Sequence, residues 1–339
     1  MFACFHVLLN EFRQDLVSGE WVLFATGRAK RPDPGNGEAK NVKQTKADCP
    51  FEDPEKFGNE VVATYFNQDK NDWFVKVAKN KFPAVLEGEA GPLKNNGPFS
   101  VYEAKGMHEI IILRDHDLCF CDYAKEDLAR IFKIYQERYL ATLDHGSRQY
   151  TLVFHNHGHG AGASIQHPHS QIMSIPILPP DVKRSLRGSE EFYKKHKKRV
   201  YDAMIDWTVE EKKRIIYENQ YFIAFCPFVS KTPYEVRIFP KESHAHFEKM
   251  PEEQLVHLGD IMKVILKKVK KSLYDPDYNF FIHTAPLEET ATDPHEFYTW
   301  HVEIVPKISM TGAFELGSGV DVNVIDPAEA AKLLRETEI

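Results

Sequence analysis

A histidine-rich segment behind a run of glycines holds the residues best suited to chemistry in this chain. It spans residues 154–171 and reads FHNHGHGAGASIQHPHSQ. Glycines without side chains let backbone N–H groups approach an anion closely. A histidine beside that anion can attack phosphorus and hold it covalently. In an extended chain, His167, His169 and Gln171 would point to one face. The segment therefore predicts a phosphate-binding loop with a histidine nucleophile at its mouth.

Two predicted helices and their flanking strands must position this segment. Apolar residues recur every three or four positions over Lys125–His145 and Glu252–Leu273, which predicts two amphipathic helices. A short apolar strand precedes each helix, at Glu109–Leu113 and Glu235–Phe239. Two more strands are predicted after each helix, at Gln149–Phe154, His169–Ile172, Tyr278–Ile282 and His301–Ile304.

The two sets of elements agree in type and order, which predicts an internal duplication. Strand–helix–strand–strand units favour an α+β fold with antiparallel sheets. We expect an N-terminal half at 1–180 and a C-terminal half at 181–339, connected by a helix within the charged stretch 179–199. Stretches rich in glycine and proline at 27–46 and 87–98 predict loops.

Composition excludes several classes of protein. The 339 residues are 42% hydrophobic and 27% charged, with a net charge of −7, which is typical of a globular protein. The acidic balance argues against a nucleic-acid binder. No apolar run approaches the about 20 residues that span a membrane, and the apolar start lacks the features of a signal peptide. The five cysteines lack the spacing of a disulfide framework, which indicates a reducing cytoplasm.

The segment His167-Pro-His-Ser-Gln171 resembles the histidine-triad superfamily, and specifically its galactose-1-phosphate uridylyltransferase branch. The usual triad has a third histidine where this chain has Gln171. A neutral amide exchanges hydrogen bonds but does not act as an acid or a base, which favours a nucleotidyl-histidine that waits for a second phosphate acceptor. The resemblance implies two histidine-triad-like repeats and ping-pong transfer of UMP from UDP-glucose to galactose 1-phosphate, with His169 as nucleophile.

Three other segments are similar to the same family. Residues 27–32 resemble its arginine-bearing loop, which contacts substrate phosphates. Residues 77–83 resemble its nucleoside-binding segment, and residues 314–319 its sugar-side segment. Through these segments and the histidine-rich one, the resemblance implies the following substrate-binding residues: Arg28, Arg31, Asn80, Phe82, Asn156, Gly162, Ser164 and Glu315.

The resemblance also implies a structural zinc site. The family commonly has Cys-Pro-Phe-Cys, and this chain has Cys49-Pro-Phe-Glu52. Cys49, His116 and His167 match three family ligands, and Glu52 stands where the second thiolate would be. A carboxylate oxygen is an acceptable zinc ligand, so we expect zinc here, fixing His167 and thereby steadying His169. The alternative is a lost site with Cys49 as a buried thiol.

The second half is expected to be chemically silent. Thr299 stands where relatives often carry a histidine, while His283, His295 and His301 are present, so two alternatives follow. One is a second metal near these histidines, and the other is a half that supplies sugar and dimer contacts, since relatives form homodimers whose sites are completed across the interface. We expect the cysteines outside motifs to be structural or solvated: Cys4, Cys119, Cys121 and Cys226.

The substrate is the least constrained part of the prediction. A UDP-glucose:galactose-1-phosphate uridylyltransferase comes first. Lys81 favours an alternative, ADP-glucose phosphorylase or a related adenylyltransferase, because uridylyltransferases tend to have an acidic residue there. Ser309 also replaces a lysine of the best-studied uridylyltransferases. A nucleotide-binding protein without turnover is the alternative from another class, and the intact His169 and Gln171 speak against it.

Overall fold

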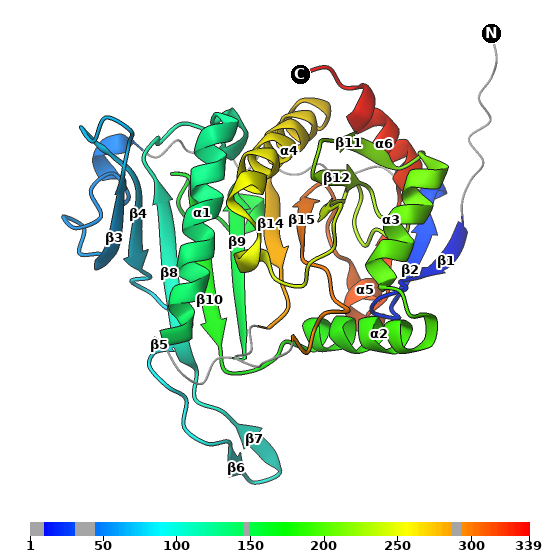
Figure 1. Cartoon of the computed structure of the whole chain (residues 1–339), viewed down its shortest axis with the longest axis horizontal. Helices are drawn as coiled ribbons and strands as arrows, with labels where there is room; N and C mark the ends of the chain where they lie inside the picture. Colours follow the sequence, from blue (N-terminus) through cyan, green and yellow to red (C-terminus); the bar gives the residue numbers. More distant parts are fainter. Residues whose placement is uncertain (1–9, 31–44, 145–148, 287–292) are drawn as a thin grey trace.

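The computed structural model describes residues 10–30, 45–144, 149–286 and 293–339 (Figure 1). Arg31, which the sequence analysis assigns to phosphate binding, lies outside these residues, as does Cys4. Loop 27–46 is described only at its ends, where Thr26–Lys30 and Lys46–Asp48 form short 3-10 helices η1 and η2.

The principal sheet takes its strands from both halves of the chain. The first half supplies β3 (Val61–Phe66), β4 (Trp73–Lys79), β5 (Leu86–Glu87), β8 (Lys105–Leu113), β9 (Tyr150–His157) and β10 (His169–Ile175). The second half supplies β11 (Ile215–Glu218), β12 (Phe222–Phe225), β13 (Val236–Pro240), β14 (Tyr278–His283) and β15 (His301–Pro306). Within the described residues this makes an 11-stranded sheet, in which β5 pairs parallel with β8 and the other pairs are antiparallel.

The strand order confirms the predicted duplication. Along the main path the order is β11-β12-β13-β15-β14-β9-β10-β8-β4-β3. It therefore reads the same outward in both directions from the pairing of β14 with β9. At that junction, Asn279 lies opposite Asn156, so the second half directly contacts the strand that enters the glycine loop. The fold is α+β with a large antiparallel sheet, as predicted.

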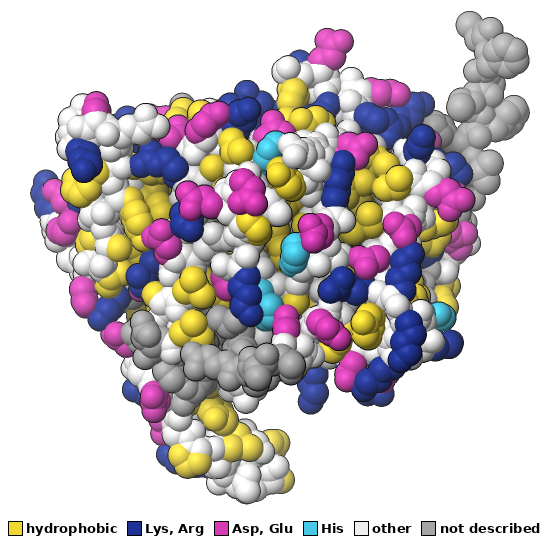
Figure 2. Space-filling view, in the orientation of Figure 1, with side chains coloured by type: hydrophobic (Ala, Val, Ile, Leu, Met, Phe, Trp, Pro, Cys, Tyr) yellow, Lys and Arg dark blue, Asp and Glu magenta, His cyan; other side chains and the backbone are white. Residues whose placement is uncertain are grey.

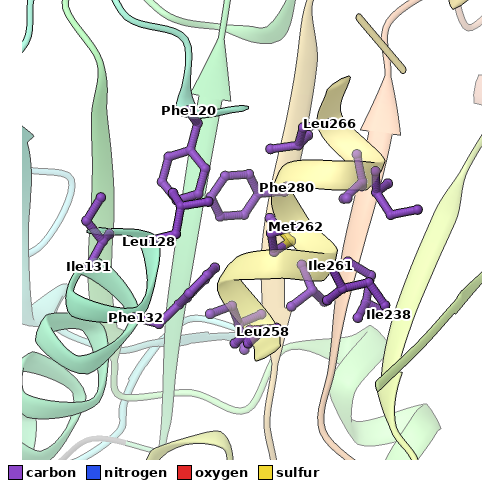
Figure 3. Packing of buried hydrophobic residues seen from close by; sticks show 14 of the residues in the cluster. Phe120, Leu128, Ile131, Phe132, Ile238, Leu258, Ile261, Met262, Leu266 and Phe280 are labelled. Carbon is purple, nitrogen blue, oxygen red and sulfur yellow. The ribbon is translucent and has the colours of Figure 1, made fainter. Parts of the chain in front are cut away.

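The two long helices pack against each other over the sheet (Figure 1). They are α1 (Lys125–Ala141) and α4 (Glu252–Ser272), within about four residues of the predicted ends. Leu128 and Phe132 from α1 meet Leu258 and Met262 from α4 in the core above the sheet (Figure 3). The helices approach so closely that a Cβ on Gly259 would lie 2.3 Å from the Lys125 carbonyl.

The remaining elements flank this core. They are α2 (Pro180–His196), α3 (Val200–Glu211), α5 (Ala313–Ser318), α6 (Pro327–Glu336), β1 (Asn10–Gln14), β2 (Trp21–Ala25) and β16 (Asp321–Asn323), with the short η3 (Phe120–Asp122), η4 (Thr142–Asp144), η5 (His159–Ala161) and η6 (Phe247–Lys249). The strands β1, β2 and β16 form a separate sheet at the end of the molecule opposite β3 and β4 (Figure 1).

Two predictions about local structure need correction. The stretch 87–98 is not all loop, because β6 (Lys94–Asn96) pairs with β7 (Phe99–Val101) in a hairpin that projects from the body (Figure 1). Gly97, with φ of 59°, makes its turn. The connection between the halves also contains a second helix, α3, after the predicted one.

The visible surface carries mixed charge. Lys, Arg, Asp and Glu side chains are interspersed over the face shown in Figure 2, as expected for a protein that does not bind a polyanion through that face. Among the helices in the described ranges, none is both long enough and apolar enough to cross a bilayer.

Candidate active site and metal centre

A cavity of about 350 Å³ brings together five of the predicted site residues. They come from three places: His169 and Gln171 from β10, Asn80 and Phe82 from the turn after β4, and Ser164 from the loop before β10. Phe51, Phe57, Asn59, Lys81 and Ile110 complete much of the wall. Among the described residues that line it none is acidic, and Lys81 supplies a positive charge, so the cavity suits an anionic ligand.

The backbone fixes the tautomer of His169, which lines the cavity. His169 Nδ1 lies 2.9 Å from the His167 carbonyl oxygen. A carbonyl only accepts, so Nδ1 carries the proton and Nε2 keeps its lone pair. Burial lowers the pKa of His169, which keeps the ring neutral. A neutral imidazole with its lone pair on Nε2 is the form that attacks phosphorus.

His108 orients Gln171, and the sequence analysis did not identify it. The Ala84 N–H donates to His108 Nδ1 (3.1 Å), so the neutral ring carries its proton on Nε2. That N–H then donates to Gln171 Oε1 at 2.9 Å. With its oxygen occupied, Gln171 has its NH2 group available as a donor. The signal that could have revealed His108 is the strand register, since Ile110 lies opposite Gln171 and His108 is two residues away on the same face.

Asn80 is oriented in a similar way. Its Oδ1 accepts the Phe82 N–H at 2.9 Å, and its Nδ2 lies 3.1 Å from His108 Nε2. Since that nitrogen carries the proton donated to Gln171, it is no acceptor for the Asn80 amide. Gln171 and Asn80 both line the cavity that contains His169.

The glycine loop is organised by an internal carboxylate. Gly160 N–H donates to Asp277 Oδ2 at 2.5 Å, and the next three N–H groups, through residue 163, bond to carbonyls within the loop. A Cβ on Gly158, where φ is 84°, would lie 1.8 Å from Asp277 Oδ1. The glycines thus permit Asp277 to approach, and the amides of residues 160–163 already have acceptors. This differs from the expected open phosphate cradle.

Among the described residues, four other predicted substrate-binding residues do not line the cavity: Arg28, Asn156, Gly162 and Glu315. Asn156 accepts a hydrogen bond from Asn279 at 2.8 Å, and Gly162 turns the loop with φ of 89°. Arg28 is exposed in η1 directly after β2. Glu315 lies in α5, where its side chain accepts the Gly312 N–H. Arg28 and Glu315 therefore belong to the end of the molecule that carries the small sheet.

The expected zinc ligands do converge. Cys49, His116 and His167 offer ligand atoms that all lie within 4.8 Å of one another. Cys49 Sγ is 3.5 Å and His116 Nδ1 is 3.1 Å from His167 Nδ1. Glu52 Oε1 lies 3.0 Å from His116 Nδ1 and 3.7 Å from His167 Nδ1, although it is not part of the tight group of three.

The local chemistry fits a metal ion. His167 Nε2 lies 2.5 Å from the Leu113 carbonyl, so Nε2 carries the proton and Nδ1 turns its lone pair toward the other ligands. Burial lowers the pKa of His167 to about 4, which keeps the ring neutral. Glu52 Oε1 is buried and accepts no hydrogen bond among the described residues, whereas Oε2 accepts from Arg114 at 3.1 Å. The buried oxygen is therefore suited to be the fourth ligand.

The second half contains a comparable cluster of candidate metal ligands, made of different residues. His283, His301 and Glu303 offer atoms within 4.8 Å of one another. However, Arg237 Nε lies 3.2 Å from Glu303 Oε2, and the Arg237 and His283 charges hold the pKa of the Glu303 carboxyl well below its usual range against the effect of burial. The buried Arg237 guanidinium therefore already neutralises Glu303, in the place where a metal cation would do so.

Comparisons with known proteins establish the family. A model described as galactose-1-phosphate uridyl transferase, N-terminal domain, matches residues 5–179. The ADP-glucose phosphorylase of Arabidopsis thaliana is 32% identical over 337 residues, covering 97% of this chain and 93% of that protein. The chain belongs to the galactose-1-phosphate uridylyltransferase family. A model of a domain of unknown function, DUF4921, also matches residues 102–337.

Other members extend over the same length. The galactose-1-phosphate uridylyltransferase of Thermotoga maritima is 27% identical over 347 residues, 98% of this chain and 99% of that protein. The Arabidopsis thaliana ADP-glucose phosphorylase with bound ADP-glucose superposes with a TM-score of 0.81 at 30% identity, over 98% of this chain and 100% of that one. A uridylyltransferase structure gives 0.73 at 25% identity, over 96% and 97%. Family membership places the chain among nucleotidyltransferases.

Proposed function

We propose that this enzyme transfers a nucleoside monophosphate from a nucleotide sugar to a phosphate-bearing acceptor through covalent attachment to His169. The observation that carries the proposal is the lone pair on His169 Nε2, which the bond from Nδ1–H to the His167 carbonyl directs away from the backbone. Gln171 and Asn80 present amide donors to the same cavity, where they can stabilise charge on a phosphoryl group.

The transfer requires two displacements at phosphorus. In the first, His169 Nε2 attacks the phosphorus next to the nucleoside, a P–N bond forms, and the P–O bond to the sugar phosphate breaks. In the second, an oxygen of the acceptor phosphate attacks the same phosphorus and the P–N bond breaks. The group that leaves is a sugar phosphate in the first step and the His169 imidazole in the second. Both are of low basicity, so neither step needs a histidine at position 171 to donate a proton.

We propose ADP-glucose as the preferred donor and orthophosphate as the acceptor. Lys81 lines the cavity beside Asn80 and Phe82, and its ammonium donates to the Phe57 carbonyl at 3.1 Å. No carboxylate is therefore at the position where uridylyltransferases tend to hold ribose hydroxyls. The Arabidopsis thaliana relative at 32% identity is named ADP-glucose phosphorylase. Phe82, 83% exposed at the edge of the cavity, offers a ring face to a nucleobase.

UDP-glucose with galactose 1-phosphate is the second candidate. It is the activity that the sequence predicts first, and the Thermotoga maritima relative carries that name along its full length. The geometry at His169 and Gln171 serves both donors equally, because the attacked phosphorus has the same surroundings in each. The difference lies in the nucleoside pocket around Lys81.

We further propose that a second copy of the chain completes the site. Arg28 and Glu315 resemble the family's phosphate and sugar contacts, yet neither lines the cavity at His169 in its own chain. A symmetric homodimer would bring Arg28 of the partner chain to the substrate phosphates, where a planar guanidinium suits phosphate oxygens. Each dimer would then contain two equivalent sites.

The metal, in this proposal, is structural zinc held by Cys49, His116, His167 and Glu52. Four protein ligands leave no open position for substrate, so the ion supplies rigidity rather than a Lewis acid. Because His167 precedes β10 by two residues and its carbonyl holds His169, fixing the His167 ring also fixes the nucleophile.

Steady-state kinetics with matched substrates test the proposal. We expect turnover with ADP-glucose and orthophosphate to exceed turnover with UDP-glucose and galactose 1-phosphate by about tenfold or more in kcat/KM. The double-reciprocal lines at varied acceptor should be parallel, since the first product leaves before the acceptor binds. A higher kcat/KM for UDP-glucose would reverse the choice of donor, and converging lines would exclude a covalent intermediate.

A further inference from the structure

A pair of thiols near the metal centre has no part in the proposed transfer. Cys119 and Cys121 bring their sulfur atoms within 3.1 Å of each other, with Cys121 as the donor. Phe120 between them packs on Phe132 and Phe280 at ring distances of 6.1 and 5.1 Å (Figure 3). Because this ring anchors the segment in the core, the two thiols are held facing each other.

The surroundings of Cys119 favour its thiolate. Cys119, His157 and Lys270 line one cavity of about 200 Å³, and the Tyr278 hydroxyl lies 3.8 Å from Cys119 Sγ. The hydrogen bond from Cys121 and the charge at His157 lower the pKa of Cys119 against the opposing effect of burial. The same bond, with burial, raises the pKa of Cys121. The two pKa shifts run in opposite directions, so Cys119 is the thiol of the pair that ionises first.

We propose that Cys119 is a site of oxidation by a hydroperoxide and that Cys121 resolves the product to a disulfide. Cys119 is buried, with 7% of its surface exposed, but it lines a cavity next to a second cysteine. A reachable thiol of lowered pKa beside a second cysteine is the arrangement that redox-reactive cysteines share. The cavity gives a molecule as small as hydrogen peroxide a route to Cys119, whereas Cys121 is fully buried. This site is independent of the identity of the nucleotide donor.

The reaction balances in two steps. First, the Cys119 thiolate attacks one oxygen of hydrogen peroxide, the S–O bond forms, the O–O bond breaks, and the hydroxide released takes a proton to become water. Second, the Cys121 sulfur attacks the sulfenic acid at Cys119, the S–S bond forms and the S–O bond breaks. The second hydroxide takes the proton of the Cys121 thiol. The two sulfurs lose two electrons in total, and the peroxide gains them.

Oxidation is favoured over metal binding at this pair. The Asp122 carboxylate, the third candidate ligand of the cluster, accepts the Cys119 N–H at 3.1 Å and pairs with Lys270 at 3.5 Å. A lysine ammonium at this position stabilises a thiolate, but it opposes a metal cation by charge repulsion. The carboxylate is therefore already neutralised within the chain.

Thiol mapping of the full-length protein tests the proposal. The protein is treated with one equivalent of hydrogen peroxide, quenched, alkylated in denaturant and digested for mass spectrometry. We expect a peptide with a Cys119–Cys121 disulfide, lighter by two hydrogen atoms and not alkylated. The pair should react at least about tenfold faster than Cys226, which is fully buried among core residues.

Variants separate the two roles. Cys121→Ser should leave a sulfenic acid at Cys119 that dimedone traps, whereas Cys119→Ser should yield neither adduct nor disulfide. Cys226→Ser should match the wild type and serves as the control. Oxidation of Cys119 no faster than that of Cys226 in the wild type would overturn the proposal. Loss of one bound metal ion per chain in the Cys119→Ser variant would also overturn the proposal.

Discussion

His108 shows how a residue outside the histidine-rich motif can orient a side chain within it. It receives the Ala84 N–H on one nitrogen and donates to Gln171 Oε1 from the other. The backbone thus sets the tautomer of His108, which sets the orientation of the Gln171 amide. Donors fixed in advance cost no reorganisation when charge develops on the phosphoryl group.

A double-mutant cycle tests this chain of contacts. We expect His108→Ala to slow single-turnover attachment of the nucleotide to His169 about tenfold, because an unrestrained amide donates less often. Gln171→Ala should cost about 10²-fold. Since His108 acts through Gln171, adding His108→Ala to Gln171→Ala should change the rate little. Multiplicative effects would contradict the positioning role, and His196→Ala, at an exposed histidine of α2, is the control.

The sequence motifs predict most of the residues that meet at the cavity but not His108. His169, Gln171, Asn80, Phe82 and Ser164 meet in one cavity because each lies in a contiguous motif whose local geometry is specific. His108 has no such motif around it. Its role depends on the pairing of two strands far apart in sequence, and that register is a property of the whole sheet.

At the scale of elements, the metal would join a loop to the ends of two strands, β8 and β10, that already pair with each other. Cys49 and Glu52 lie in a loop, His116 follows β8, and His167 precedes β10. The metal would therefore fix the loop of Cys49 and Glu52 to the paired ends of β8 and β10, close to His169. The carboxylate at position 52 also ties the centre to Arg114.

Metal analysis with point variants tests the ligand set. We expect about one zinc ion per chain in protein purified without added metal. Cys49→Ala should lose it and lower the midpoint of thermal unfolding, because three neighbouring groups lose their common partner. Glu52→Cys should keep the metal with higher affinity. Cys226→Ala is the matched control, and zinc content well below one per chain in the wild type would exclude the site.

His246 should give the second half a pH-dependent contribution to stability. Its ring lies between Glu248 (3.2 Å) and Asp293 (3.0 Å), with Lys249 near Asp293. Burial opposes protonation, but the two carboxylates outweigh it and raise the pKa of His246. A group with a raised folded pKa stabilises the protein fully below its unfolded pKa, and that contribution is lost as the pH rises through the folded pKa.

Denaturation at several pH values measures this contribution. We expect the wild type to exceed His246→Asn in free energy of unfolding near pH 6, and the difference to shrink toward pH 9, well above an ordinary histidine pKa of about 6.5. Urea titrations of both proteins across this range give the difference directly. A difference that stays constant with pH would show that His246 contributes by packing alone.

The sequence predicts best those helices and strands in which apolar residues recur regularly over many positions. The ends of α1 and α4 and the strands beside them follow from residue spacing. The hairpin at β6 and β7 escapes prediction because its strands are short and exposed, so no buried face imposes a period of two. Helix α3 directly follows α2. The two are separate helices because the backbone breaks near Lys197, where φ is 55°.

At the scale of the whole molecule, the two halves share one strand order but carry different polar residues. The strand order is symmetric about the pairing of β9 with β14, yet the glycine loop and the histidine pair occur only in the first half. The second half has Arg237 within its histidine cluster. It also contributes Asp277 and Asn279, which hold the glycine loop of the first half.

Subunit mixing tests whether a second chain completes the site. His169→Asn and Arg28→Ala should each be impaired as pure proteins. After the two are unfolded together and refolded, we expect up to about a quarter of wild-type activity, because half of randomly paired dimers contain one intact site out of two. No recovery above the Arg28→Ala background would show that Arg28 serves its own chain or no site at all.

The central claim is that His169 carries the nucleotide, and direct detection of the adduct tests it best. The wild type is mixed with ADP-glucose without acceptor, denatured in alkali, digested and analysed by mass spectrometry. We expect an adenylyl group on His169, absent from His169→Asn and removed when orthophosphate is added before denaturation. An adduct on a different residue, or none from either ADP-glucose or UDP-glucose, would contradict it.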